Sequence, residues 1–244
     1  MSSRAFEKRQ RSYWRTADGI RFRWQTRNPV LARREAELTR RVTLAAGERL
    51  LEIGCGEGAN LHHLRRDGAM RVGIDYSGAR AAFARHATDA HIATADGTQL
   101  PFSDESFDSV LIRDVLHHLP DGAAVLREAR RVLKSGGRLT LVEPNRKSPL
   151  IWMQALLIPA ERGVLRSSAA RLSSLLAAAG FRVTHQSTEQ PFPIERVLLH
   201  PSIGLPSLAQ LPRVVHALHA VDAIARRLLP AGSWMYLVFE AMRT

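Results

Sequence analysis

Three alternate glycines, Gly54, Gly56 and Gly58, follow a short apolar run at residues 50–53 and precede a helical pattern. Only a residue without Cβ lets the backbone turn this sharply and lets a ligand lie against the chain. The next helix directs free N–H groups and a positive dipole end at the same loop, which favours an anionic or carbonyl-rich ligand. Asp75 follows the next apolar run, where its carboxylate can accept both hydroxyls of a ribose. The spacing therefore indicates a site for a nucleoside cofactor.

The glycine loop alone leaves two classes of enzyme open. Gly54, Gly56 and Ala59 also fit the dinucleotide fingerprint G-x-G-x-x-G/A, and Asp75 lies at about the spacing which that fingerprint expects. A nicotinamide-dependent oxidoreductase is therefore one hypothesis. The sequence further downstream has to separate the two classes.

Several further motifs follow the loop in order. They are Thr94-Ala95-Asp96-Gly97, Leu100-Pro101-Phe102, the run 106–112, Val115-Leu116-His117-His118-Leu119 and the run 128–139. This series resembles the class I S-adenosylmethionine-dependent methyltransferases, in particular their small-molecule branch (methyltransferase type 11-like). The resemblance is close over residues 48–143 and looser over residues 167–188. Several motifs in order are far more specific than one glycine loop.

The resemblance implies a role for residues at the predicted strand ends. The three glycines would cradle the methionine part of the cofactor with Glu52 beneath, Asp75 would hold the ribose hydroxyls, and Asp96 with Gly97 would hold the adenine amino group. Arg113 and Val115 would contact the methionyl side through backbone groups. The complete cofactor-binding set that we expect is Glu52, Gly54, Cys55, Gly56, Gly58, Asp75, Tyr76, Asp96, Gly97, Arg113 and Val115. The turn requires only a small residue at Cys55, so we expect no catalytic thiol there.

Two histidines follow the fourth predicted strand. Methyl transfer is an in-line displacement, so the enzyme mainly supplies alignment and a dry site. A hydroxyl or carbon acid also needs a general base, for which His118 is the candidate and His117 the lesser one. A structural role in the loop stays open for His118. The sequence contains no metal-ligand spacing, and we expect no metal.

Composition and charge limit the class of protein. The chain has 244 residues, 45% of them hydrophobic, and one cysteine, which excludes an internal disulfide. The charged N-terminus lacks the apolar run of a secretory signal, so we expect a cytoplasmic protein. The apolar run 149–159 is about half as long as a membrane span requires. Peripheral contact with a membrane stays open.

The net charge of +12 raises the question of a nucleic-acid partner. Residues 1–50 carry 13 basic and 5 acidic side chains, and such an arm can bind phosphate, nucleic acid or an anionic membrane. Only Lys8, Lys134 and Lys147 are lysines, a skew that favours a compositional bias. The loop 113–116 also lacks the Asn/Asp-Pro-Pro-aromatic element that resembled enzymes place beside a nucleic-acid base. Nucleic acid is therefore not expected as a partner, and an RNA methyltransferase is the alternative hypothesis.

Alternating strand and helix patterns predict an α/β fold, a Rossmann-like, doubly wound, mostly parallel seven-stranded sheet. We expect strands at 49–53, 70–74, 91–94, 107–112 and 138–143, a sixth from Gly180-Phe181, and a closing antiparallel strand at 233–240. The expected helices begin at Asn28-Pro29 and run to about Ala46, begin at Ser77, run from Asp121 to Gly136, and run from Ser167 or Ser168 to Ala179. A further amphipathic helix begins at Pro212.

We expect a single domain over residues 1–244. Its parts are a basic and aromatic N-terminal arm with a helix (1–47), the cofactor-binding core (48–143), apolar cap segments with a helix and strand six (144–232), and the closing strand (233–244). The helix from Pro212 would place Leu211, Val214, Val215, Leu218, Val221, Ala225 and Leu228 on one face, and Arg213, Asp222, Arg226 and Arg227 elsewhere. It is either a lid on its own domain or a membrane element, and both would give the site apolar walls.

These patterns favour a methyltransferase that uses S-adenosyl-L-methionine and acts on a small, largely apolar acceptor at oxygen or carbon. Acceptors of this kind are a phenol, a quinone precursor, a polyketide or a lipid-linked molecule. A protein that holds the cofactor without turnover is a further hypothesis.

Overall fold

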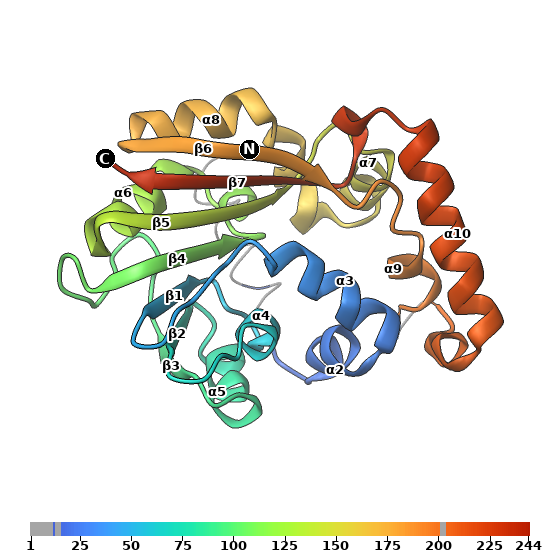
Figure 1. Cartoon of the computed structure of the whole chain (residues 1–244), viewed down its shortest axis with the longest axis horizontal. Coiled ribbons are helices and arrows are strands. Elements are labelled where there is room, and N and C mark those ends of the chain that lie inside the picture. The colour runs from blue at the N-terminus through green and yellow to red at the C-terminus, as the bar shows by residue number, and fades with distance from the viewer. Residues whose placement is uncertain (1–11, 13–15, 201–203) are drawn as a thin grey trace.

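Seven strands form one sheet in the order β3-β2-β1-β4-β5-β7-β6 (Figure 1). The structure is a computed structural model, and it describes Ser12 and residues 16–200 and 204–244. The strands are β1 (Arg49–Ile53), β2 (Met70–Asp75), β3 (His91–Thr94), β4 (Phe107–Arg113), β5 (Leu133–Pro144), β6 (Phe181–Glu189) and β7 (Tyr236–Arg243). β7 runs antiparallel to both of its neighbours, and the pairs among β1 to β5 are parallel. The predicted fold class is confirmed.

Helices cover both faces of this sheet because its central strands are apolar on both sides. Leu51 of β1 packs in the cluster that includes residues of α6 and α8, whereas Leu50 packs in a second cluster with Leu61 of α4. This alternation is the period of two that an extended strand imposes. The α-helices are α2 (Ile20–Arg27), α3 (Pro29–Thr39), α4 (Ala59–His63), α5 (Gly78–Ala87), α6 (Gly122–Val132), α7 (Pro149–Leu157), α8 (Ala169–Ala178), α9 (Glu195–Leu198) and α10 (Pro212–Leu228). The short 3-10 helices are η1 (Leu116–His118), η2 (Pro159–Arg166), η3 (Pro206–Gln210) and η4 (Ala231–Ser233).

The predicted caps are found, but several element ends were predicted wrongly. Asn28, Ser77, Asp121 and Ser168 each accept a backbone N–H at the start of a helix. The helix expected to reach about Ala46 ends at Thr39, and Val42 of the following loop packs in the core. The helix expected to end at Gly136 stops at Val132, because Leu133 already pairs with Phe107 in the sheet. The closing strand begins at Tyr236 and not at residue 233, since residues 231–233 form η4.

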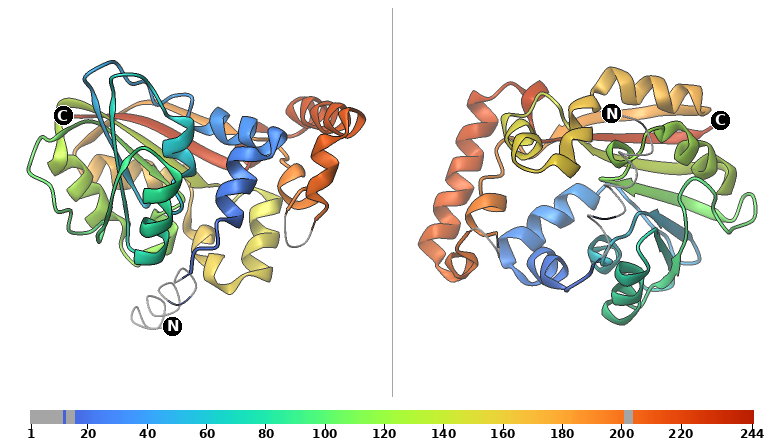
Figure 2. Two further views of the ribbon diagram at one scale, coloured as in Figure 1. Left: turned by 90° about the horizontal axis from the view of Figure 1, so that it is seen from below. Right: turned by 180° about the vertical axis from the view of Figure 1, so that it is seen from behind.

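A cap of helices lies beyond the carboxyl ends of the strands. Figures 1 and 2 show α3, α7, α9 and α10 gathered at this end of the sheet. The cap is held by charge as well as by apolar packing, since buried Arg34 of α3 lies 2.6 Å from Glu195 of α9 and 2.7 Å from Asp222 of α10. The predicted cap segments within residues 144–232 therefore lie beside the strand ends.

Helix α10 faces the protein with a different stripe from the one predicted. Leu218 and Ala225 are buried as expected, but Asp222 lies between them on the buried side, where it pairs with Arg34. Val221 and Leu228 were predicted to lie on the covered face and are exposed instead. Within residues 16–200 and 204–244, no helix combines the length and the apolar content needed to cross a bilayer.

Candidate active site

The glycine loop has the backbone that its sequence predicts. Gly54, Gly56 and Gly58 have φ values of +77°, +54° and +87°, a region that L side chains rarely adopt. A Cβ on Gly54 would overlap the Val115 side chain. A Cβ on Gly56 would meet only the Arg80 guanidinium, at 3.8 Å. Gly54 is therefore required because a side chain there would clash with Val115. The space at Gly56 is open, so that a ligand can lie against the backbone.

Asp75 closes the loop from the end of β2. Its Oδ2 accepts the Gly56 N–H at 2.8 Å, and its Oδ1 accepts the Ser77 N–H at 2.8 Å. Burial raises the pKa of Asp75, and these backbone donors and the Arg80 guanidinium partly oppose the rise. Each carboxylate oxygen can accept a further hydrogen bond. Asp75 is therefore fixed in position and can still receive hydroxyl donors.

A cavity of about 1370 Å³ opens at the carboxyl ends of the strands. It is lined by most of the predicted site residues, namely Gly54, Cys55, Gly56, Asp75, Tyr76, Asp96, Gly97, Arg113, Val115, His117 and His118. Glu52 and Gly58 lie outside this lining, while Glu57 and Ala59 contribute to it. The structure thus brings four separate segments, 54–56, 75–76, 96–97 and 113–118, around one space at the carboxyl ends of the strands, as predicted.

Glu52 lies buried beneath the loop. Its Oε1 accepts the Asn60 amide at 2.6 Å, and Asn60 Oδ1 in turn accepts an Arg113 N–H at 2.7 Å. Its Oε2 has no hydrogen-bond partner among the described residues. Burial raises the pKa of Glu52 to about 7, against the opposing effects of Asn60 and Arg113. A buried carboxyl with one unused oxygen suits a polar cofactor group reaching the loop.

Three other predicted residues lie at the rim or in the core. Asp96 is exposed and accepts the N–H and hydroxyl of Thr98, and Tyr76 is half exposed beside it in the cavity lining. The Cys55 side chain is buried in an apolar cluster, and burial raises the pKa of its thiol well above the ordinary value. A thiol of this kind is not nucleophilic, in agreement with the expectation for Cys55.

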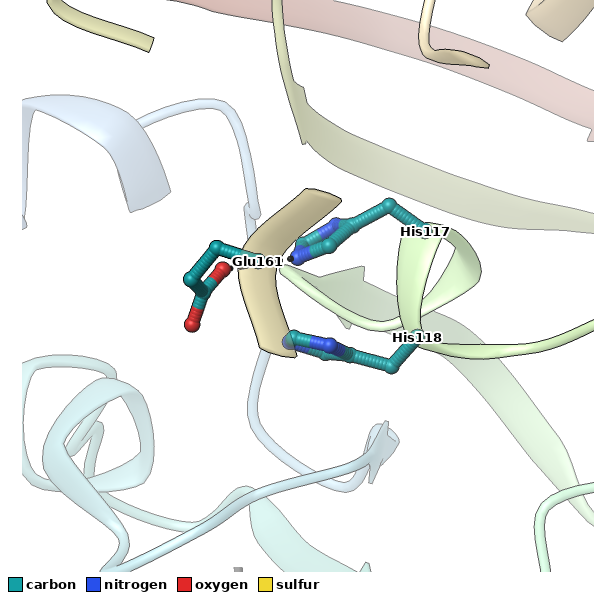
Figure 3. A group of neighbouring side chains, drawn as sticks. All are labelled: His117, His118 and Glu161. Carbon is teal, nitrogen blue, oxygen red and sulfur yellow. Dashed lines mark ion pairs between the residues drawn. The ribbon is translucent and has the colours of Figure 1, made fainter. Parts of the chain in front are cut away.

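Glu143 organises the loop after β4. Its carboxylate accepts the N–H groups of Val115 and Leu116 at 2.9 and 2.7 Å and lies 2.8 Å from Nδ1 of His117. Nε2 of His117 lies 3.5 Å from a carboxylate oxygen of Glu161 in η2 (Figure 3). Burial opposes the charged imidazole, but the two carboxylates raise the pKa of His117 to about 10. A protonated imidazole cannot accept a proton, so the geometry favours His118 over His117 as a base.

His118 lines the cavity directly beside His117, with ring centres 3.9 Å apart. Burial lowers the pKa of His118 well below its ordinary value, and the positive charges of His117, Arg21 and Arg80 add to this effect. The ring is therefore neutral at physiological pH. A neutral imidazole at the cavity wall can accept a proton or orient an acceptor.

The polar floor of the cavity was not predicted from the sequence. Tyr236 and Arg196 line it together with Arg113, and both guanidinium groups stack near the Tyr236 ring, at 5.3 and 5.7 Å from its centre. Glu35 of α3 joins the two arginines at 2.6 Å each. Nothing local marks these residues, because Glu35 and Arg196 are 161 positions apart. Only the charge-rich helix sequence around Glu35 hints at a buried partner.

Helix α2 reaches over the glycine loop. The Phe22 N–H donates to Glu57 of the loop at 3.0 Å, and Trp24 lines the cavity while its indole N–H donates to the Leu199 carbonyl at 2.8 Å. Phe22 also packs edge-on against Phe83 of α5. The N-terminal segment is therefore both a latch on the core and part of the cavity wall. Residues 1–11 and 13–15 of the basic arm lie outside the described residues.

Residues 51–141 match the family model described as a methyltransferase domain. This match and the fold confirm the resemblance to the class I S-adenosylmethionine-dependent methyltransferases over residues 51–141. The matched segment begins in β1 and ends in β5, so it covers the five parallel strands and the glycine loop.

The chain is similar to three further known proteins. It is 34% identical over 148 residues to a demethylmenaquinone methyltransferase from Corynebacterium kroppenstedtii, a match that covers 59% of this chain and 64% of that protein. The phosphoethanolamine N-methyltransferase 2 of Haemonchus contortus, solved with S-adenosyl-L-methionine, superposes with a TM-score of 0.68 at 20% identity, over all of this chain and 60% of that one. The [4+2]-cyclase SpnF superposes with a TM-score of 0.59 at 22% identity, over 87% and 80%. The structural matches establish the fold, whereas the chemistry has to be argued from the site.

Proposed function

We propose that this protein is a methyltransferase that transfers the methyl group of S-adenosylmethionine to oxygen or carbon of a small, largely apolar acceptor, with a quinone precursor as the leading candidate. One observation carries the proposal: a single cavity runs from the glycine loop and Asp75 to the apolar residues of α7. Its volume of about 1370 Å³ exceeds the ordinary range of pockets for one small ligand. It offers room for a cofactor and an acceptor together.

The chain's own residues suit such a transfer. Bound S-adenosylmethionine would supply an electrophilic methyl group. Ile151 and Met153 of α7 would exclude water from the acceptor side, and Tyr236 and Arg196 would orient a polar group of the acceptor on the cavity floor. His118 would accept a proton from a hydroxyl or carbon acid. The relatives named demethylmenaquinone methyltransferase support a quinone-type acceptor, and their similarity covers 59% of this chain.

We propose further that the acceptor reaches the cavity from a lipid surface. Helix α7 contributes Leu157 to the cavity lining, and Trp152, Leu156 and Leu157 are 50%, 69% and 74% exposed. Large apolar side chains exposed together on one short helix are typical of a contact site. The net charge of +12 suits an anionic membrane.

The test is a methyl-transfer assay with isotopically labelled S-adenosylmethionine. Demethylmenaquinone in detergent and bulk transfer RNA serve as competing acceptors under identical conditions. The proposal expects label in the quinone fraction and none in the RNA. Label in the RNA would support the alternative hypothesis, and S-adenosylmethionine binding without any transfer would leave a protein that holds the cofactor without turnover.

A further inference from the structure

Two imidazoles and a carboxylate meet at one point of the cavity wall. His117, His118 and Glu161 each offer a ligand atom, and these atoms all lie within 4.8 Å of one another. Figure 3 shows both rings directed to the same side, where the Glu161 side chain from η2 approaches them. All three residues line the cavity that would hold the acceptor. Two of them are adjacent in sequence, so no ligand-spacing pattern could reveal the group.

The residues around this cluster orient its side chains as the residues around known metal sites do. Metal-binding histidines usually donate their second ring N–H to a carboxylate, which fixes the tautomer and aims the other nitrogen. Glu143 lies 2.8 Å from Nδ1 of His117 and leaves Nε2 directed at Glu161. The close approach of η2 is also built in, because a Cβ on Gly163 would overlap the carbonyl group of His117. The backbone therefore holds Glu161 against the two rings.

We propose that His117, His118 and Glu161 bind a first-row divalent cation at the acceptor end of the cavity. The cation would displace the proton that His117 holds between Glu143 and Glu161 in the metal-free protein. In the loaded protein His118 would be a ligand and not a free base, and the cation would promote loss of the acceptor proton instead. A cation at about 2.1 Å from nitrogen and oxygen ligands draws them to about 3–3.5 Å from one another, so small side-chain rotations complete the site. Two imidazoles and one carboxylate suit iron(II), manganese, cobalt or zinc, and do not suit calcium or magnesium, which prefer oxygen ligands. Three protein ligands leave positions open toward the cavity.

The open positions define a class of acceptor. A cation beside the apolar wall would bind and polarise an acceptor oxygen as a Lewis acid. An aromatic ring with two adjacent oxygen atoms would fill two open positions and be held in one orientation. This link to the acceptor rests on the proposed function, whereas cation binding itself does not.

Cobalt(II) is the probe for the cation site. Protein without an affinity tag is treated with chelator, dialysed and titrated with cobalt(II), and the visible d–d absorption and binding heat are recorded. We expect one saturable site per chain, and a loss of affinity of about tenfold or more in Glu161→Gln and His118→Ala. His200→Ala is the matched control, because this histidine lines the same cavity outside the cluster and should leave cobalt binding unchanged. Circular dichroism verifies that each variant is folded.

Several results would overturn the inference. They are the absence of saturable cobalt binding, an equal loss in His200→Ala, or unchanged binding in both Glu161→Gln and His118→Ala. Excess zinc should bleach the cobalt spectrum, and bleaching by magnesium at the same concentration would refute the assigned class of cation. Calorimetry with S-adenosylhomocysteine is run on the same sample. Normal cofactor binding without cobalt binding refutes this inference alone, whereas cobalt binding without cofactor binding refutes the proposed function alone.

The acceptor class is tested on the cobalt-loaded protein. Catechol should shift the d–d bands of the wild type, and phenol, which has one oxygen, should shift them less. An equal effect of the two compounds would contradict two-point binding.

Discussion

The cavity has two sides that are built by different physical means. The glycine loop is held by backbone hydrogen bonds to the neighbouring strand β2, such as those from Gly54 and Cys55 to the Ile74 carbonyl at 2.8 and 2.9 Å. The cap is held by buried ion pairs between segments far apart in sequence, such as Arg34 with Glu195. Backbone hydrogen bonds to the neighbouring strand fix the glycine loop, and ion pairs between distant segments fix the shape of the acceptor side. Substitutions can therefore perturb the two sides of the cavity separately.

The bridge between the two sides should give the largest effect. Glu35 of α3 contacts Arg113 of β4 and Arg196 of α9. Glu35 and Arg113 are buried, and the Arg196 side chain is only 12% exposed. Glu35→Gln leaves two buried guanidinium groups without their shared carboxylate, so we expect the free energy of unfolding to fall by about 3–5 kcal/mol. Denaturant unfolding measures it.

Glu37 provides the control on the same helix. It pairs with Arg34 at 3.1 Å but is partly exposed, so Glu37→Gln should cost less than about 1 kcal/mol. If the two variants were equally stable, the cap would not depend on its buried charges.

A substitution in the loop should give the next largest effect. Gly54→Ala places a Cβ on the Val115 side chain in a left-handed backbone, and we expect a loss of about 2–4 kcal/mol in stability and of most affinity for S-adenosylhomocysteine. Gly136→Ala is the control, since Gly136 has a φ of +70° and nothing within 4 Å of a Cβ. It should cost only about 1 kcal/mol and leave cofactor affinity unchanged. If Gly54→Ala bound S-adenosylhomocysteine with the affinity of the wild type, the loop would not form the cofactor site.

The pH dependence of stability tests the burial of Glu52 beneath the glycine loop. The folded pKa of Glu52 is about 7 and its ordinary value is 4.5, so the folded state binds more protons between these pH values. The free energy of unfolding should therefore fall by about 2–3 kcal/mol as the pH rises through this window. Glu52→Gln should remove this fall, which denaturant unfolding at about pH 4.5 and pH 8 would detect. An identical pH profile in the variant would contradict the burial of this carboxyl.

The outer face of the cap should give the smallest effect on stability. Leu156→Ser with Leu157→Ser removes exposed apolar area, so we expect little change in the free energy of unfolding but a loss of about tenfold in binding to anionic phosphatidylglycerol vesicles. Leu228→Ser on exposed α10 is the matched control and should leave vesicle binding unchanged. Equal retention of the wild type, the double variant and Leu228→Ser on vesicles would contradict the proposed role of α7.

The same difference explains how much the sequence could predict. The strands β1 to β4, the caps at Asn28 and Ser77 and the loop at Gly54 follow from local rules, and each lies within a residue of where the pattern placed it. Asp222 was predicted to lie away from the covered face, since a charged residue is rarely buried without a partner. Its partner Arg34 is far away in sequence, and so are the partners of Glu35. Hydrophobic periodicity carries no information about such pairs.

Helix ends show a second limit of local rules. Gly136 has the left-handed backbone of a helix terminator, yet the helix stops four residues earlier. Leu133 gains a strand partner in Phe107, and sheet pairing outweighs the local glycine signal. The cluster of His117, His118 and Glu161 could not be predicted either, because η2 reaches the histidines only in the folded chain.

Calorimetric titration with S-adenosylhomocysteine tests the central claim most directly, that the loop at residues 54–58 and the carboxylate of Asp75 hold the cofactor. We predict saturable binding of one molecule per chain, weakened about tenfold or more by Asp75→Asn because a charge-assisted hydrogen bond contributes about 1.5–3 kcal/mol. Asp67→Asn, on an exposed turn, should bind as the wild type does. No binding by the wild type, or equal affinity in Asp75→Asn, would contradict the account.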